Sequence, residues 1–145
     1  MKYFPYLIAT IGVISILIAG CSHPNDPLEN EEQTIEVQKR IGDEHKYEDF
    51  KKISNNDQVQ KVKQILDTID WENAQPKMVR PADYIFGFQF KNPNIDAKAV
   101  SYELWISPNK ENVELVIDVD NKYAQLNKKK SAELFKILTG EKLTN

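Results

Sequence analysis

Three successive stretches of alternating residues constrain this fold more than any other feature of the sequence. Every second residue is apolar in residues 84–90, 100–107 and 113–119. Because neighbouring side chains of a strand point to opposite faces, each stretch would gather its apolar residues on one face of a β-strand. Short segments containing proline and asparagine separate the stretches. The arrangement predicts an antiparallel meander with one buried and one polar face.

Strand-like patterning also occurs nearer the N-terminus. Residues 34–40 alternate with Ile35 and Val37 on one side, which predicts a strand. The apolar residues of 46–53 are spaced by three, which fits either an irregular strand or a helical turn. Gly42 lies between the two segments and favours a turn. We therefore interpret residues 46–53 as a short strand that completes a hairpin.

Two segments have helical periodicity. Apolar residues at three- and four-residue spacing predict an amphipathic helix over residues 57–69. A second helix is predicted to begin after Asn127 or Ser131 and to end near Thr139, since Gly140 suits the position after a helix. Strands segregated from helices predict an α+β fold. We expect an antiparallel sheet of about four to five strands, with two helices packed on one face and the other face largely exposed to water.

The N-terminal segment has the organisation of a secretory signal. Lys2 precedes an apolar segment that begins near Phe4 and ends in small residues directly before Cys21, the single cysteine of the chain. Small residues that end on a cysteine resemble the lipobox of bacterial lipoproteins. The resemblance implies cleavage after Gly20 and acylation of Cys21. It places the protein at the cell membrane, lipid-anchored on the extracytoplasmic face.

Two other interpretations of this segment remain open. Residues 4–19 could form a membrane-spanning anchor, but such a helix needs about 20 apolar residues. An ordinary cleaved signal would require no cysteine at its end. The lone Cys21 favours lipidation, because exported proteins normally use cysteines in disulfide pairs. Two acyl chains would also provide stable anchoring.

The predicted organisation is a signal peptide over residues 1–20, a flexible tether over 21–33 and a single α+β domain over 34–145. The tether is assigned because its two prolines and several acidic residues leave almost no apolar content. The formal net charge of −3 shows no basic excess, so nucleic acid is not an expected partner. The expected partners are the membrane, through Cys21, and an envelope protein or wall polymer.

Groups suited to catalysis are scarce in the sequence. His23 falls in the tether and His45 in a turn, so no histidine pair shares an element that could hold a metal. No nucleophile elbow, phosphate-binding loop or dinucleotide fingerprint is present. We therefore predict no catalytic residues, no metal, no cofactor and no enzymatic activity. A cell-wall hydrolase would need a carboxylate pair or metal site that the sequence does not assemble.

Two charged segments have a functional and a simpler interpretation. Asp118 and Asp120 start a pattern that fails as a calcium loop, because Lys122 and Tyr123 occupy its fifth and sixth positions. A strand end followed by a turn is the favoured interpretation, with a weak divalent contact as the alternative. The lysine run of residues 128–130 could contact phosphates, although such a run is more often simply solvated.

Trp105 is the candidate partner contact. The alternation predicts that its side chain points to the polar face of the sheet, beside Glu103. Tryptophan is enriched at binding hot spots, so Trp105 and Glu103 are the candidate contact residues. The alternative is that Trp105 packs beneath the tether, residues 76–81 or residues 46–53.

Three short motifs suggest a relationship. Residues 81–84, 102–107 and 130–134 are similar to motifs of small uncharacterised Gram-positive lipoproteins, the YhfM-like group. The similarity covers roughly residues 35–143 and implies an extracytoplasmic α+β domain, but it carries no functional residue over. The predicted function is a membrane-anchored extracytoplasmic lipoprotein with a non-catalytic binding domain. A surface-exclusion or immunity lipoprotein is the alternative, and a cell-wall hydrolase is less favoured.

Overall fold

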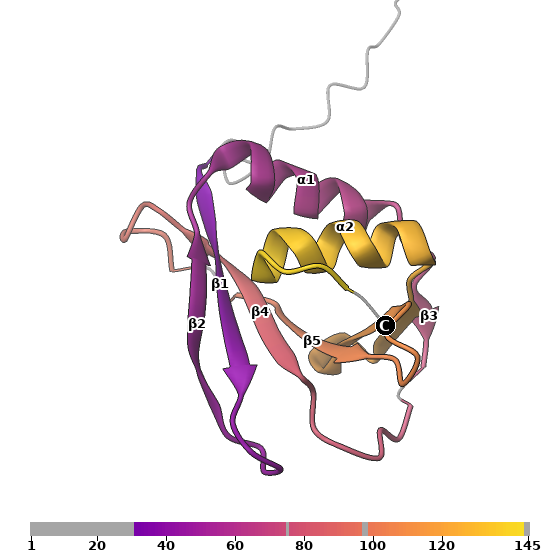
Figure 1. The fold of residues 1–145 in the computed structure, drawn as a ribbon. Coiled ribbons are helices and arrows are strands. Elements are labelled where there is room, and N and C mark those ends of the chain that lie inside the picture. The colour runs from indigo at the N-terminus through magenta and orange to yellow at the C-terminus, as the bar shows by residue number, and fades with distance from the viewer. Residues whose placement is uncertain (1–30, 75, 97–98, 144–145) are drawn as a thin grey trace, which may run out of the picture.

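The computed structural model describes residues 31–74, 76–96 and 99–143. In this part of the chain, seven strands form one antiparallel sheet, and two helices cover one of its faces (Figure 1). The strands are β1 (Gln33–Arg40), β2 (Tyr47–Ile53), β3 (Glu72–Asn73), β4 (Tyr84–Phe90), β5 (Ser101–Ile106), β6 (Val113–Ile117) and β7 (Lys122–Gln125). The helices are α1 (Asn56–Asp67) and α2 (Lys128–Thr139), and a 3-10 turn, η1 (Asp118–Asp120), precedes β7.

The strand order across the sheet is β2-β1-β4-β5-β6-β7-β3. The predicted meander is confirmed as β4 to β6 and continues into β7, while β1 and β2 form the predicted hairpin beside β4. The sheet has seven strands, so the prediction of about four to five was wrong in number. The two additional strands are β3 and β7, which have two and four residues. Such short segments have too few residues to show a period.

Asparagine side chains cap both helices. The Asn55 side chain accepts a hydrogen bond from the Gln58 amide at 3.0 Å, and Asn127 accepts one from the Lys130 amide at 2.9 Å. Asn127, and not Ser131, is therefore the cap of α2. Gly140 follows α2 with a φ of 83°, the left-handed conformation expected there. The sequence predicted both helices correctly because these signals are local.

The main core lies between the helices and the sheet. The aromatic stripe of β4 contributes Phe86, which is 1% exposed, whereas Phe88 is only partly buried at the margin of the core. Fully buried side chains of this size each stabilise the fold by about 1.5–3 kcal/mol. The largest fully buried side chains in this core are those of Phe86, Ile35, Leu104, Leu115, Leu134 and Leu138.

Among the described residues, no helix has the length and apolar character needed to cross a membrane.

The sheet face opposite the helices is only partly exposed to water. Residues 76–83, here called the strap, join β3 to β4 and pack on this face. Ala82 of the strap forms a second buried cluster with Trp105 of β5 and Val116 of β6. The strap therefore covers part of the face that the sequence predicted to be largely wet, and this cover shapes the candidate site.

Candidate functional site

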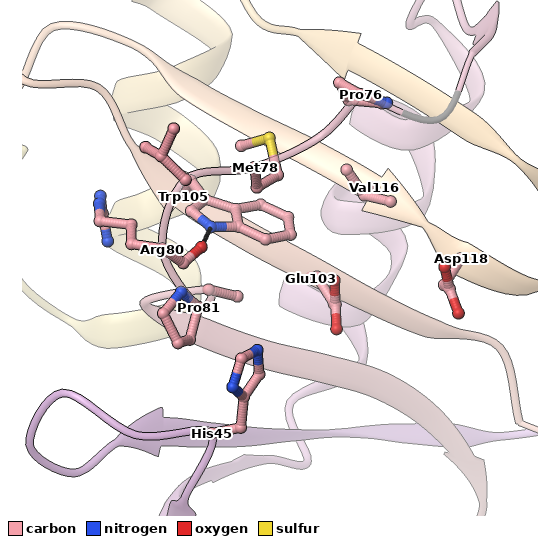
Figure 2. Close-up of a pocket in the computed structure, with 11 residues that line it drawn as sticks. His45, Pro76, Met78, Arg80, Pro81, Glu103, Trp105, Val116 and Asp118 are labelled. Carbon is pink, nitrogen blue, oxygen red and sulfur yellow. Dashed lines mark hydrogen bonds between the residues drawn. The ribbon is translucent and has the colours of Figure 1, made fainter.

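A pocket of about 290 Å³ opens beside the strap, on the sheet face away from the helices (Figure 2). We call it the strap pocket. Its walls come from three places: the turn between β1 and β2, the strap itself, and the segment from β5 and β6 to η1. The side chains that determine its chemistry are those of His45, Met78, Arg80, Glu103, Trp105 and Asp118.

The strap buries Trp105. The residue is 5% exposed, and its indole N–H donates a hydrogen bond to the carbonyl of Arg80 at 2.9 Å. Met78 of the strap packs against the same cluster and lies beside the indole ring (Figure 2). Trp105 is therefore not exposed on the polar face of the sheet. The alternative that placed Trp105 beneath residues 76–81 is correct, because the strap supplies both an apolar cover and a hydrogen-bond acceptor.

Asp83 fastens the end of the strap to the sheet. Its carboxylate accepts a hydrogen bond from the Ile106 amide at 2.7 Å and a second from Arg40 at 3.3 Å. It also forms a bidentate pair with Arg80, in which the second contact is 2.8 Å long. The backbone of Asp83 adds an amide donation to the Leu104 carbonyl at 2.8 Å. The strap is thus bound to β1 and β5 by a network of charge-assisted hydrogen bonds.

The charges of this network determine the ionisation of Asp83. Burial alone would raise the pKa of the Asp83 carboxyl. The hydrogen bonds from Arg80 and the Ile106 amide, with a further one from Arg40, outweigh burial and lower the pKa below its ordinary value of 3.8. Asp83 is consequently a carboxylate at neutral pH. In the same network, the Arg80 guanidinium also donates to the Ile106 carbonyl at 2.9 Å and points away from Glu103 and Asp118 (Figure 2).

Glu103 differs from Asp83 in lacking partners. Its side chain is partly buried in the pocket wall, yet it makes no hydrogen bond or ion pair with any residue that the structure describes. Its cross-strand neighbours are Ile85 on β4 and Val116 on β6, neither of which can neutralise it. By contrast, Glu36 on β1 faces Lys52 on β2 and pairs with it at 3.2 Å. Glu103 is therefore a partly desolvated carboxylate whose oxygens remain available.

The electrostatic surroundings of Glu103 come from three elements. Burial raises the pKa of the Glu103 carboxyl, and the negative charge of Asp118 on η1 raises it further. His45, in the turn between β1 and β2, acts in the opposite direction. The structure thus brings the two predicted contact residues, Trp105 and Glu103, into one pocket, together with Asp118 and His45. Asp120 does not line this pocket.

The remaining predicted sites have plainer surroundings. Two of the three lysines of residues 128–130 are engaged: Lys128 pairs with Glu111 at 2.7 Å, and Lys130 donates to the Thr68 carbonyl beyond the end of α1. Within the described ranges, no group of three or more histidine, cysteine, aspartate or glutamate side chains is placed to hold a metal ion. Cys21 and the predicted signal peptide lie outside the described residues, as does most of the predicted tether.

Sequence reasoning missed the residues that hold the strap. Arg80 and Asp83 are spaced by three around Pro81, a pattern that fits a local ion pair in a turn. That signal could have suggested an ordered segment between the two prolines of residues 76–81. It could not have shown that Arg40 and the Ile106 amide complete the network, because both are distant in sequence.

Comparison with known proteins identifies one relationship. The model of the YhfM protein family matches residues 29–144. This range contains the whole sheet, both helices, the strap and every residue of the strap pocket. No curated protein matches the chain, and no solved structure matches it. Because the family model covers well over half of the sequence, the chain belongs to the YhfM family.

Proposed function

We propose that this chain is a lipid-anchored extracytoplasmic lipoprotein whose domain is a non-catalytic binding module. The observation that carries the proposal is the strap pocket, an open cavity of about 290 Å³ with a partly buried, unpaired carboxylate in its wall. The anchor in this proposal is Cys21, and the tether from Cys21 to Gln33 would span at most about 43 Å. The pocket would therefore operate close to the outer face of the membrane.

The construction of the pocket supports a binding role. Hydrogen bonds from Trp105 to Arg80, from Tyr47 to Ala82 and from the Asp83 backbone to Leu104 fix the strap on the sheet. A wall that is ordered before a ligand arrives reduces the entropy lost on binding. Val79 is 100% exposed at the rim and offers an apolar contact to a partner. The expected partner is an envelope protein or a wall polymer.

The anchor is tested by replacing Cys21 with alanine. The variant should lose all incorporation of labelled palmitate, because no other cysteine can accept the acyl chain. It should also remain uncleaved at this site, because the lipobox resemblance places cleavage directly before the lipidated cysteine. The measurement is palmitate labelling and the size of the product in cells that make the full chain. Label on the variant would contradict the proposed anchor.

The binding role is tested with a photo-crosslinking amino acid at Val79. In intact cells, illumination should produce a discrete covalent adduct at this position, because Val79 projects from the pocket rim. Gln60 is the matched control, since it is exposed on α1, on the opposite side of the sheet. Equal adducts at both positions, or no adduct at Val79, would contradict a binding site at the strap pocket.

A further inference from the structure

We infer that the strap pocket binds an organic cation, an ammonium or guanidinium group, through the carboxylate of Glu103. This inference rests on the proposed binding role of the pocket and specifies the chemistry of its ligand. Its starting point is a polar group that folding has partly removed from water without supplying a partner. Burial penalises an ionised carboxylate that has no partner, so a cation beside Glu103 would offset this penalty.

No described cation of the protein is available to neutralise Glu103 by contact. Arg80 lines the same pocket, but its guanidinium is occupied by Asp83 and by the Ile106 carbonyl. Arg40, another nearby arginine, donates to Asp83 and to the Gly42 carbonyl. His45 makes no hydrogen bond or ion pair with Glu103 and is exposed at the pocket mouth. The fixed arginines therefore serve the strap and leave the Glu103 carboxylate for a ligand.

The rest of the lining suits the apolar part of such a ligand. Met78, Val79 and Val116 present aliphatic surface, and Trp105 adds a small accessible part of its ring. Ammonium and guanidinium groups are usually carried on methylene chains that pack along apolar surface. A volume of about 290 Å³ holds a group of several non-hydrogen atoms, because one water occupies about 30 Å³. The pocket thus matches a short alkyl chain that ends in a positive charge.

The potential in the pocket favours the same ligand. Asp118 lines the pocket with Glu103, and its charge contributes to the raised pKa of the Glu103 carboxyl. Burial raises the pKa of Tyr47, whose hydroxyl contacts the strap, and the charge of Glu103 raises it further. A cation placed beside Glu103 would relieve this repulsion, whereas an anion would add to it.

The test uses the full chain in a non-ionic detergent, with three probes of nearly equal shape: pentylamine, pentanol and pentanoate. Binding is followed by NMR. The indole N–H resonance of Trp105 reports binding, and the indole N–H resonance of Trp71, which packs on the helix side, is the internal reference. Pentylamine should shift the Trp105 signal saturably and leave Trp71 unchanged. Pentanol and pentanoate should bind at least about tenfold more weakly, because a hydrogen bond between charged groups is lost.

Two variants show whether Glu103 is responsible. Glu103→Gln should weaken pentylamine binding about tenfold or more. Glu36→Gln removes an equal charge from an exposed position of β1, outside the pocket, and should change the affinity less than twofold. Glu103→Gln should also keep or raise the melting temperature, because it removes a partly desolvated charge near Asp118. If Glu103→Gln lowered the melting temperature as well as weakening pentylamine binding, Glu103 would be merely structural, and the inference would be overturned.

The cation could belong to a free small molecule or to a side chain of a protein. A capped pentapeptide with one central lysine among glycines distinguishes these sources. Binding at least as tight as that of pentylamine assigns the cation to a protein side chain, and binding of pentylamine alone assigns it to a small molecule. A response to calcium without one to pentylamine overturns the inference. Adducts at Val79 without pentylamine binding would overturn the inference while leaving the proposed binding role intact.

Discussion

Replacing Trp105 with alanine is expected to lower the free energy of unfolding by about 3–5 kcal/mol. The substitution removes the largest side chain of the cluster that Trp105 forms with Ala82 and Val116, and it leaves the strap without its packing surface. It also leaves the Arg80 carbonyl without the indole donor, which is 2.9 Å away in the structure. Equilibrium unfolding in denaturant measures the change.

Trp105→Phe is the matched variant for this experiment. It keeps an aromatic ring beneath Met78 but removes the hydrogen bond to Arg80, so it should cost about 1 kcal/mol. The difference between the two variants then measures the packing beneath the strap. If Trp105→Ala left the melting temperature within a few degrees of the native value, the strap would not be packed on the sheet as described.

Replacing Asp83 with alanine is expected to lower the free energy of unfolding by about 2–4 kcal/mol, which is the second large effect. The carboxylate binds Arg80, Arg40 and the Ile106 amide, and its side chain is only 17% exposed. Removing one member of such a network leaves the remaining charges and donors without partners. Asp49→Asn is the control, since Asp49 is an exposed carboxylate that accepts a hydrogen bond from Gln38. It should change stability by no more than about 0.5 kcal/mol.

The pH dependence of this effect has a definite sign. Because the pKa of Asp83 in the folded protein is lower than its ordinary value of 3.8, ionised Asp83 stabilises the fold above that value. This contribution is lost as the pH falls from about 3.8 through the lower folded-state pKa. The stability difference between the native protein and Asp83→Asn should therefore be largest near neutral pH and shrink in acid. A difference that stays constant down to pH 2 would contradict the role given to the Asp83 charge.

The strap pocket depends on residues of two kinds, those that hold the strap and those available to a ligand. Trp105 and Asp83 hold the strap on the sheet, whereas Glu103 stands in the pocket wall without a partner among the described residues. Residues of the first kind should affect stability strongly. Glu103 should affect ligand binding with little or no cost to stability. This separation is typical of a site in which a few residues carry function at the expense of local stability.

The sequence by itself determined the local elements of the fold. Alternation in residues 84–90, 100–107 and 113–119 was sufficient to predict β4, β5 and β6 and the face that each would bury. Apolar residues at three- and four-residue spacing marked α1, and Asn127 or Ser131 with Gly140 marked α2, because these signals act within a few residues of one another. Alternation also placed Trp105 and Glu103 correctly on the face away from the helices.

Only the tertiary structure decided what covers that face. Whether Trp105 is exposed depends on where residues 76–83 lie, and this depends on Arg40 of β1 and the backbone of Ile106 in β5. Neither partner lies near the strap in sequence, and no periodicity records such contacts. The short strands β3 and β7 were missed for a related reason, since the pairing of β7 with β6 and of β3 with β7 places them in the sheet. The pocket is the result of these long-range contacts, which is why only the structure could join Trp105 and Glu103 with the strap and His45 in one cavity.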